Sequence, residues 1–263
     1  MSGIVRRCAP PRGTLLAALL HAAPYCDCFS LSLPLAGASA AADVQPASAS
    51  ASSALSAVYR MSADSPPSPP SPSPCDGLAD GPALTAYMRA FYTSRATSPA
   101  RAALPLLGLP ALPPVEDAWT HAFAPGSRFG PFHITSRAAL ASSDDYVCGS
   151  EAALAWGPWR GVSGLSWHAL LLRRGDAGAE DVLTFALGSL LWRAGAHGDG
   201  AMAAAAAAAT AAMTGGGATG EDVPNLRLPA ARGWNGVLPL SRVYARLLLA
   251  AAVDRHIRAA GLL

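Results

Sequence analysis

The sequence predicts an α+β protein in which an antiparallel β-sheet packs against a long C-terminal α-helix. Two observations carry this prediction. Residues 165–172 and 182–192 alternate apolar and other side chains with the period of a β-strand, and the segment 174–178 between them has the composition of a turn. Residues 240–258 instead carry apolar side chains at helical spacing. The two strands form a predicted central hairpin, and the helix would lie across the apolar face of the sheet.

Alternation in the hairpin assigns each side chain to one face of its strand. One face of each strand is apolar, formed by Leu165, Trp167, Ala169 and Leu171 in the first strand and by Leu183, Phe185, Leu187 and Leu191 in the second. The opposite faces carry Ser166, His168, Thr184 and Gly188. We therefore expect the two apolar sets to form one core face, with His168 on the polar face of the sheet.

Further elements surround the hairpin. Residues 25–33 alternate as a first strand that Pro34 ends. A helix is predicted where Leu84, Tyr87, Met88 and Phe91 recur at helical spacing, and a second helix begins at Ser98. Residues 129–137, with Phe132 and Ile134 inward, and residues 146–150 complete the predicted strands. On the last helix, the expected apolar stripe is Leu240, Val243, Tyr244, Leu247, Leu248 and Ala251.

Two low-complexity segments interrupt this single domain, which we place at residues 21–263. Residues 36–80 are rich in Ala, Ser and Pro, and residues 195–230 contain an alanine run followed by glycines. Small side chains and prolines cannot build a core, so both are predicted to be disordered insertions. The alanine run is too short and too weakly apolar to cross a bilayer, and no transmembrane span is predicted.

Residues 1–20 contain three arginines and no acidic residue. This composition is compatible with an organellar transit peptide, and an untargeted, disordered start is the alternative. The predicted domain therefore begins after this segment, and cytoplasmic and organellar locations both stay open.

Composition argues against several classes of function. The formal net charge is only +2 and the basic residues are scattered, so no nucleic-acid partner is expected. Five cysteines show no framework spacing, which predicts reduced thiols, among them Cys26 and Cys28, rather than structural disulfides. The six histidines form no ligand pair, and Gly215–Gly220 lacks the strand and helix that a dinucleotide motif requires. We expect no metal and no cofactor.

Aromatic side chains give the candidate binding site. If the sheet, the first helix and the last helix share a core, five aromatic residues would converge there: Tyr87, Phe91, Trp167, Phe185 and Tyr244. Simple core packing is one interpretation of this set. A cavity lined by the same residues and holding an apolar ligand is the other.

The order of elements resembles an uncharacterised, mostly bacterial family of small proteins with a START-like, helix-grip fold. The resemblance rests on the helix segment Ala86–Ser94, on the hairpin ending in Leu183–Ser189, and on Leu238–Leu248, which contains an Arg-x-Tyr-x-Arg run. It covers about 150 residues and implies a curved antiparallel sheet that grips a long C-terminal helix.

This resemblance implies a leading function and leaves two alternatives. START-like folds commonly hold ligands between sheet and helix, so we expect non-enzymatic binding of a small apolar molecule there. An enzyme acting on such a ligand, in the manner of START-like cyclases, is the first alternative, with His168 or Arg160 as its polar groups. The second is an interaction protein that recruits partners through the proline-rich tract at 65–74.

Overall fold

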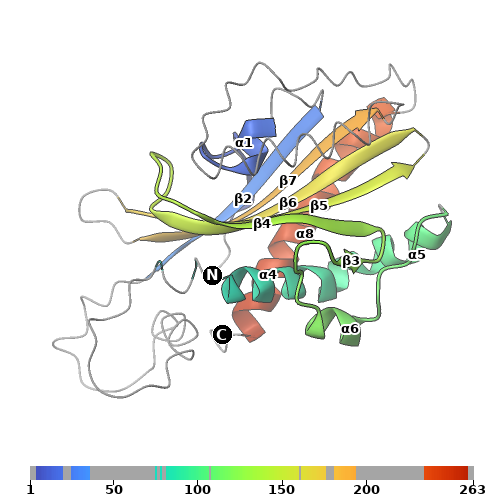
Figure 1. Ribbon diagram of the computed structural model, residues 1–263, viewed down its shortest axis with the longest axis horizontal. Coiled ribbons are helices and arrows are strands. Elements are labelled where there is room, and N and C mark those ends of the chain that lie inside the picture. Colours follow the sequence, from blue (N-terminus) through green and yellow to red (C-terminus); the bar gives the residue numbers. More distant parts are fainter. Residues whose placement is uncertain are drawn as a thin grey trace.

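The computed structural model describes residues 4–19, 25–35, 75, 78, 81–106, 108–159, 161–175, 181–193 and 234–259 (Figure 1). The elements in chain order are β1 (Arg6–Arg7), α1 (Leu15–Leu19), β2 (Tyr25–Pro34), α4 (Pro82–Thr93), the 3-10 helix η2 (Arg95–Thr97), α5 (Ser98–Leu106), α6 (Val115–Thr120), β3 (Arg128–Phe129), β4 (Phe132–Leu140), β5 (Cys148–Trp159), β6 (Val162–Arg173), β7 (Val182–Arg193) and α8 (Trp234–Ala259).

Seven strands form one antiparallel sheet in the order β1-β2-β7-β6-β5-β4-β3. The central hairpin, the first strand and the two long helices α4 and α8 lie where the sequence predicted them. Figure 1 shows α4 and α8 on one side of the sheet and α1 on the other. We call these the α8 face and the α1 face. The predicted α+β architecture, an antiparallel sheet with a C-terminal helix, is confirmed.

The register between β6 and β7 overturns the prediction of a single core face. Trp167 pairs with Gly188, His168 with Leu187, and Leu170 with Phe185. Directly paired residues project from the same face of a sheet. Trp167 and Phe185 therefore lie on opposite faces, because the odd-numbered residues of β6 pair with the even-numbered residues of β7. A register shift of one residue would place Trp167 and Phe185 on the same face. Alternation within each strand does not determine the register between the two strands.

Both faces of the sheet are buried. The α8 face packs against α4 and α8, and its core includes Phe29, Ile134, Leu154, Leu170, Phe185, Leu187, Leu84, Tyr87, Met88, Phe91, Leu249 and Val253. The α1 face has a second core, formed by Leu15, Leu16, Leu19, Cys28, Leu140, Tyr146, Ala153, Leu165, Trp167, Ala169, Leu171, Ala186, Leu190 and Trp192. The second face was predicted to be polar, and this was wrong because α1 covers it.

The N-terminal segment belongs to the fold. Strand β1 pairs with β2, and the three leucines of α1 are buried against the α1 face. The interpretation of this segment as a disordered start is therefore wrong for residues 4–19, whose apolar run Leu15–Leu19 supplies three buried leucines to the core of the α1 face. Whether the segment also acts in targeting stays a prediction.

A disulfide joins Cys75 to Cys148, which contradicts the prediction that all cysteines are reduced. Cys148 begins β5, and Cys75 lies 73 residues earlier in the sequence. No spacing rule reveals such a pair, because the fold alone brings the two residues together. Leu78 is also buried in the core of the α8 face, so the predicted disordered insertion at 36–80 does not extend through Cys75 and Leu78. Its other residues, the proline tract and the 195–230 segment lie outside the described residues.

Helix α8 is longer than predicted, and a different side of it faces the sheet. Val243 and Leu247, predicted on the buried stripe, are exposed. The buried side chains are instead Leu249, Ala252, Val253 and His256. The stretch Leu247–Val253 is apolar on every side, so its spacing does not select one face. Among the described residues, no helix is both long enough and apolar enough to span a membrane.

Candidate functional site

A cavity of about 260 Å³ lies between the α8 face of the sheet and the helices that cover it. The sheet and α8 supply opposite walls, while α4 and α5 close the sides. The lining residues are Phe29, Phe91, Tyr92, Ala100, Leu104, Leu112, Phe132, Ser166, Leu187, Gly188, Ser189, Ser241, Tyr244, Ala245 and Leu248. Ser241 is exposed and Leu104 half-buried, so the cavity reaches solvent where α5 and α8 approach each other.

Strand alternation explains the chemistry of the sheet wall. Phe29, Leu187 and His168 form one cross-strand row on the α8 face, and Asp27, Ser189 and Ser166 form the next row. The first row contributes apolar surface to the cavity. The second contributes the hydroxyls of Ser166 and Ser189. An apolar chamber therefore has a polar strip along one side, the arrangement that orients a ligand in most small-molecule sites.

His168 supports this polar strip from behind. Its Nε2 atom lies 3.2 Å from Ser166 Oγ and 3.3 Å from the Tyr92 hydroxyl. Both partners line the cavity. The imidazole itself is completely buried, and its ring stands edge-on to Phe91 at 4.8 Å between centroids. The environment of His168, predicted to be the polar face of the sheet, is thus an aromatic interior.

Burial controls the protonation of this group. Loss of solvent lowers the pKa of His168 to about 3 and raises the pKa of the Tyr92 hydroxyl. At neutral pH both groups are neutral, so they act as hydrogen-bonding dipoles beside the cavity. His168 Nδ1 makes no hydrogen bond within the described residues. Nothing there orients the ring in the way that a carboxylate orients the histidine of a catalytic triad.

The five predicted site residues separate into three groups. Phe91 and Tyr244 line the cavity. Tyr87 and Phe185 are fully buried beside it, in contact with each other at 5.3 Å between ring centroids, and form part of the core. Trp167 lies on the α1 face, so its predicted convergence with the other four was wrong. Arg160, proposed as a polar group for catalysis, lies outside the described residues.

Several lining residues escaped the sequence analysis, chiefly Phe29, Tyr92, Phe132, Ser166 and Leu187. Tyr92 directly follows Phe91 but was not part of the predicted stripe. A signal for Ser166 did exist, because Ser166 and His168 are polar residues two apart on an otherwise apolar strand. Such a pair lies on one face of the strand and, once that face is buried, its members need hydrogen-bond partners.

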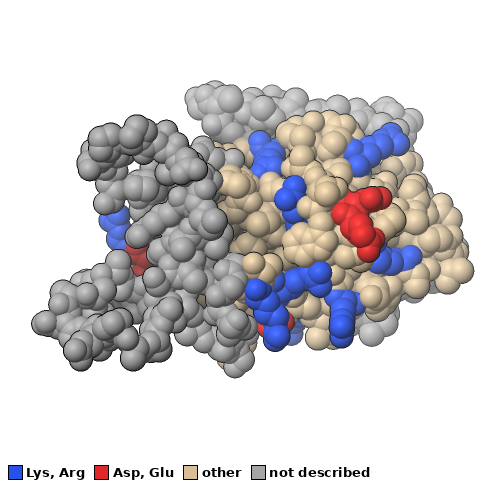
Figure 2. All heavy atoms as spheres, turned by 90° about the horizontal axis from the view of Figure 1, so that it is seen from below, with Lys and Arg blue, Asp and Glu red and all other residues tan. Residues whose placement is uncertain are grey.

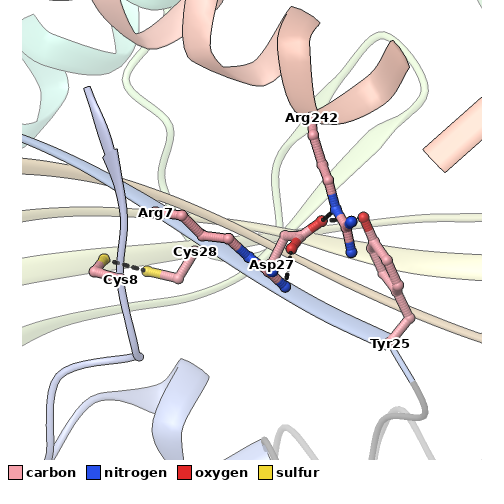
Figure 3. A network of polar contacts seen from close by, with 6 residues as sticks. All are labelled: Arg7, Cys8, Tyr25, Asp27, Cys28 and Arg242. Atoms are coloured by element: carbon pink, nitrogen blue, oxygen red, sulfur yellow. Dashed lines mark hydrogen bonds and ion pairs between the residues drawn. The ribbon is translucent and has the colours of Figure 1, made fainter. Parts of the chain in front are cut away.

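A second polar cluster fixes α8 beside the cavity (Figure 3). Asp27, buried on β2, accepts a hydrogen bond from Arg242 Nε at 2.8 Å and another from the Tyr25 hydroxyl. Arg7 Nη2 lies 2.7 Å from the other carboxylate oxygen, where it forms an ion pair without hydrogen-bond geometry. One carboxylate therefore connects β1, β2 and α8. The carboxylate is buried while both arginine side chains reach solvent. Removing the arginines would leave a buried charge without partners, so the cluster favours the observed position of α8 relative to the sheet.

Tyr244 makes a further connection. Its hydroxyl donates to the Ala96 carbonyl oxygen in η2 at 2.8 Å, while its ring faces the cavity. Figure 2 shows the underside of the molecule, where several basic side chains and a group of acidic side chains lie among uncharged residues. No group of three or more His, Cys, Asp or Glu side chains within the described ranges is placed to hold a metal ion.

Comparisons with known protein families, with curated proteins and with solved structures found no match for this chain. The resemblance to START-like proteins therefore stays a prediction, and the argument for function depends on the geometry of the site.

Proposed function

We propose that this protein binds a small, mainly apolar molecule in the cavity between the sheet and α8, without transforming it. The observation that carries the proposal is the cavity itself: a chamber of about 260 Å³ walled mostly by aromatic and aliphatic side chains, with hydroxyls along one side. It lies where a START-like, helix-grip fold would hold a ligand, which supports the proposal as a fold-level analogy.

The volume limits the size of the ligand. An apolar cavity of about 150 Å³ is sufficient to bind benzene. The present cavity, at about 260 Å³, is roughly twice that size. We expect a compact molecule with one or two rings, or a short branched chain, rather than a long acyl chain or a sterol.

The polar strip predicts one hydrogen-bonding group on the ligand. Hydroxyls such as that of Ser166 can donate or accept a hydrogen bond. A ligand hydroxyl or carbonyl placed against Ser166 would join the hydrogen bonds that already connect this residue to His168. The remaining walls are mainly apolar and carry no charged side chain among the described lining residues. A strongly charged ligand would therefore lose more free energy of hydration than neutral hydroxyls could restore.

Catalysis on such a ligand is the weaker candidate, although Ser166 and His168 are placed like a nucleophile and its base. A general base works best when its pKa lies near the operating pH. Burial lowers the pKa of His168 to about 3, and Nδ1 has no orienting partner in the part of the chain that the structure describes. The pair is better suited to hydrogen-bonding a ligand than to activating the serine hydroxyl.

Binding of 2-naphthol tests the proposal, because this probe has two fused rings and one hydroxyl. We expect saturable binding of one probe per chain by isothermal titration calorimetry. Ala245→Trp places an indole in the cavity and should weaken binding at least tenfold, since Ala245 lines the chamber. The matched control is Val243→Trp, which adds the same side chain at an exposed position of the same helix and should leave affinity unchanged.

Thermal unfolding of both variants must first show that they fold. If folded wild-type protein takes up no probe, or if Ala245→Trp binds as well as Val243→Trp, the cavity is not a binding site. If the probe binds as expected, native mass spectrometry of protein purified from its own source, followed by organic extraction, identifies the natural ligand class.

A further inference from the structure

Strand β1 places two thiols against each other on the α1 face of the sheet. Arg6 pairs with Ser30 and Arg7 with Phe29, so continuing this register places Cys8 opposite Cys28. The Cys8 amide donates to the Cys28 carbonyl oxygen at 3.0 Å, and the two sulfur atoms are 3.4 Å apart. Figure 3 shows both sulfurs directed toward each other from neighbouring strands.

This pairing suits a disulfide. In an antiparallel pair that exchanges backbone hydrogen bonds, the facing Cα atoms are about 5.5 Å apart, which falls within the range of about 4.4 to 6.8 Å that disulfides span. Cys26 is on the same face two residues from Cys28, a rise of about 6.5 Å along the strand, and is poorly placed to pair with it. Cys8 and Cys28 are therefore the matched pair.

The two thiols differ in access and acidity. Cys8 is half-buried, whereas Cys28 is buried. The hydrogen bond between the two thiols lowers the pKa of Cys8 to about 6 against the opposing effect of burial, with support from Ser30 and from the charge of Arg173. The same contact raises the pKa of Cys28, and burial raises that of Cys26 to about 11. At neutral pH, Cys8 is the thiolate that a solvent oxidant can reach.

We propose that Cys8 and Cys28 are a peroxide-reactive pair, in which Cys8 is the nucleophile and Cys28 the resolving thiol. The Cys8 thiolate attacks one oxygen of a hydroperoxide, the O–O bond breaks, and an alcohol or water leaves after taking up a proton. The product is Cys8 sulfenic acid. The Cys28 sulfur then attacks the Cys8 sulfur, its proton leaves with the hydroxyl as water, and a disulfide forms. Two thiols are oxidised and one peroxide is reduced.

The consequence is a covalent link between the N-terminal segment and the sheet. Residues 4–19 contact the rest of the protein through β1, α1 and Arg12, and β1 has just two paired residues. A disulfide at Cys8 would hold this segment on β2 whenever peroxide is present. The proposal does not depend on the cavity, which lies on the opposite face.

Peroxide titration with cysteine mapping tests the proposal. Freshly reduced protein receives two equivalents of hydrogen peroxide at pH 7, one for this pair and one for the bridge between Cys75 and Cys148. Remaining thiols are alkylated, and the digest is analysed by mass spectrometry. We expect a peptide pair linked through Cys8 and Cys28, lighter by two hydrogen atoms than the reduced peptides. The bridge between Cys75 and Cys148 re-forms in the same sample and serves as an internal reference.

Two variants separate the steps. Cys28→Ser keeps a hydrogen-bond donor beside Cys8 but removes the resolving sulfur, so a sulfenic acid should persist on Cys8 and be trapped by dimedone. Cys26→Ser is the matched control and should form the Cys8 to Cys28 link as the wild type does. Peroxide should oxidise Cys8 faster than Cys26 by on the order of a hundredfold or more, since the thiolate is the reactive form. Free Cys8 and Cys28 after peroxide, or a dimedone adduct mainly on Cys26, would overturn the proposal.

Discussion

The two faces of the sheet are made by the same strands, yet one shows close packing at Gly188 and the other borders a cavity. On the α1 face, small residues allow a close approach: a Cβ atom at Gly188 would lie 2.3 Å from Leu16 Cδ2. On the α8 face, large aromatic residues hold α8 away from the sheet, and about 260 Å³ remains open. An apolar stripe on a strand therefore identifies a buried face without distinguishing a core from a pocket.

Glu151 on the α1 face and His168 on the α8 face are both buried, and the two respond oppositely to pH. On the α1 face, the Glu151 carboxylate accepts hydrogen bonds from the Leu15 amide and from Trp167 Nε1 at 2.7 Å. Burial nevertheless outweighs these bonds and raises the pKa of Glu151 to about 7. On the α8 face, burial lowers the pKa of His168 to about 3. Both groups are close to neutral at pH 6, as desolvation requires.

The largest expected effect comes from Trp167→Ala. This change empties a fully buried site on the α1 face and removes one donor to Glu151. Loss of a buried tryptophan costs about 3 to 5 kcal/mol of unfolding free energy, measurable by urea denaturation. The folded fraction should still bind 2-naphthol, because the cavity lies on the other face. If binding is lost while the protein stays folded, packing on the α1 face affects the cavity on the α8 face, and the two faces are not independent.

A tryptophan outside both cores provides the control. Trp119 is partly exposed and lies under Arg255, whose guanidinium carbon is 5.2 Å from the ring centroid. Trp119→Ala should lose about 1 kcal/mol or less, the contribution of an exposed cation–π contact. Equal losses for the two tryptophans would mean that the α1 face is not a true core.

The next largest effect is on the pH dependence of the unfolding free energy, which Glu151→Gln should change. Because the pKa of Glu151 is higher in the folded than in the unfolded chain, the folded state binds the extra proton between pH 4.5 and about 7. The stabilisation that this proton gives the folded state is fully present below pH 4.5 and is lost as pH rises through 7. The unfolding free energy should fall by up to about 3 kcal/mol over this range. Glutamine imitates the protonated form, so the variant should lack this loss when unfolding is followed by urea at several pH values.

His168 and His256 affect stability in the opposite direction as pH changes. In Glu151→Gln they should account for most of the remaining pH dependence of the unfolding free energy between pH 4.5 and 6.5. Burial lowers the pKa values of His168 and His256 to about 3 and about 4. Their stabilisation is present above the unfolded value of 6.5 and is lost as pH falls toward the folded values. The stability of Glu151→Gln should thus rise steadily from pH 4.5 to 6.5 and then level off. A variant whose stability still declines between pH 6 and 7.5 would show that another group causes that decline.

The smallest expected effect is that of Tyr244→Phe. The change removes the hydrogen bond to the Ala96 carbonyl but keeps the ring in the cavity wall. A loss of about 1 kcal/mol in unfolding free energy is expected, with 2-naphthol affinity changed less than threefold. A tenfold loss of affinity in a stable variant would mean that the hydroxyl contacts the ligand, and would move the polar group of the site from the sheet to α8.

Prediction from sequence worked best for single elements. The spacing of Leu84, Tyr87, Met88 and Phe91 correctly identified the buried side of α4, because only one side of that helix is apolar. The same method misassigned α8, where Val243 and Leu247 are exposed. It also found two cavity residues, Phe91 and Tyr244, but missed Ser166 and Tyr92, whose importance depends on contacts with His168 from two different elements.

Local pattern by itself determined the α+β class, the hairpin and the positions of α4 and α8, because periodicity and turn residues act over a few neighbours along the chain. Tertiary structure decided the rest: which strand face meets which helix, the link between Cys75 and Cys148, and the contact of Cys8 with Cys28. Each of these depends on register or on residues distant in sequence. Register is selected by the packing of the whole sheet, because a slip of one residue exchanges its two faces.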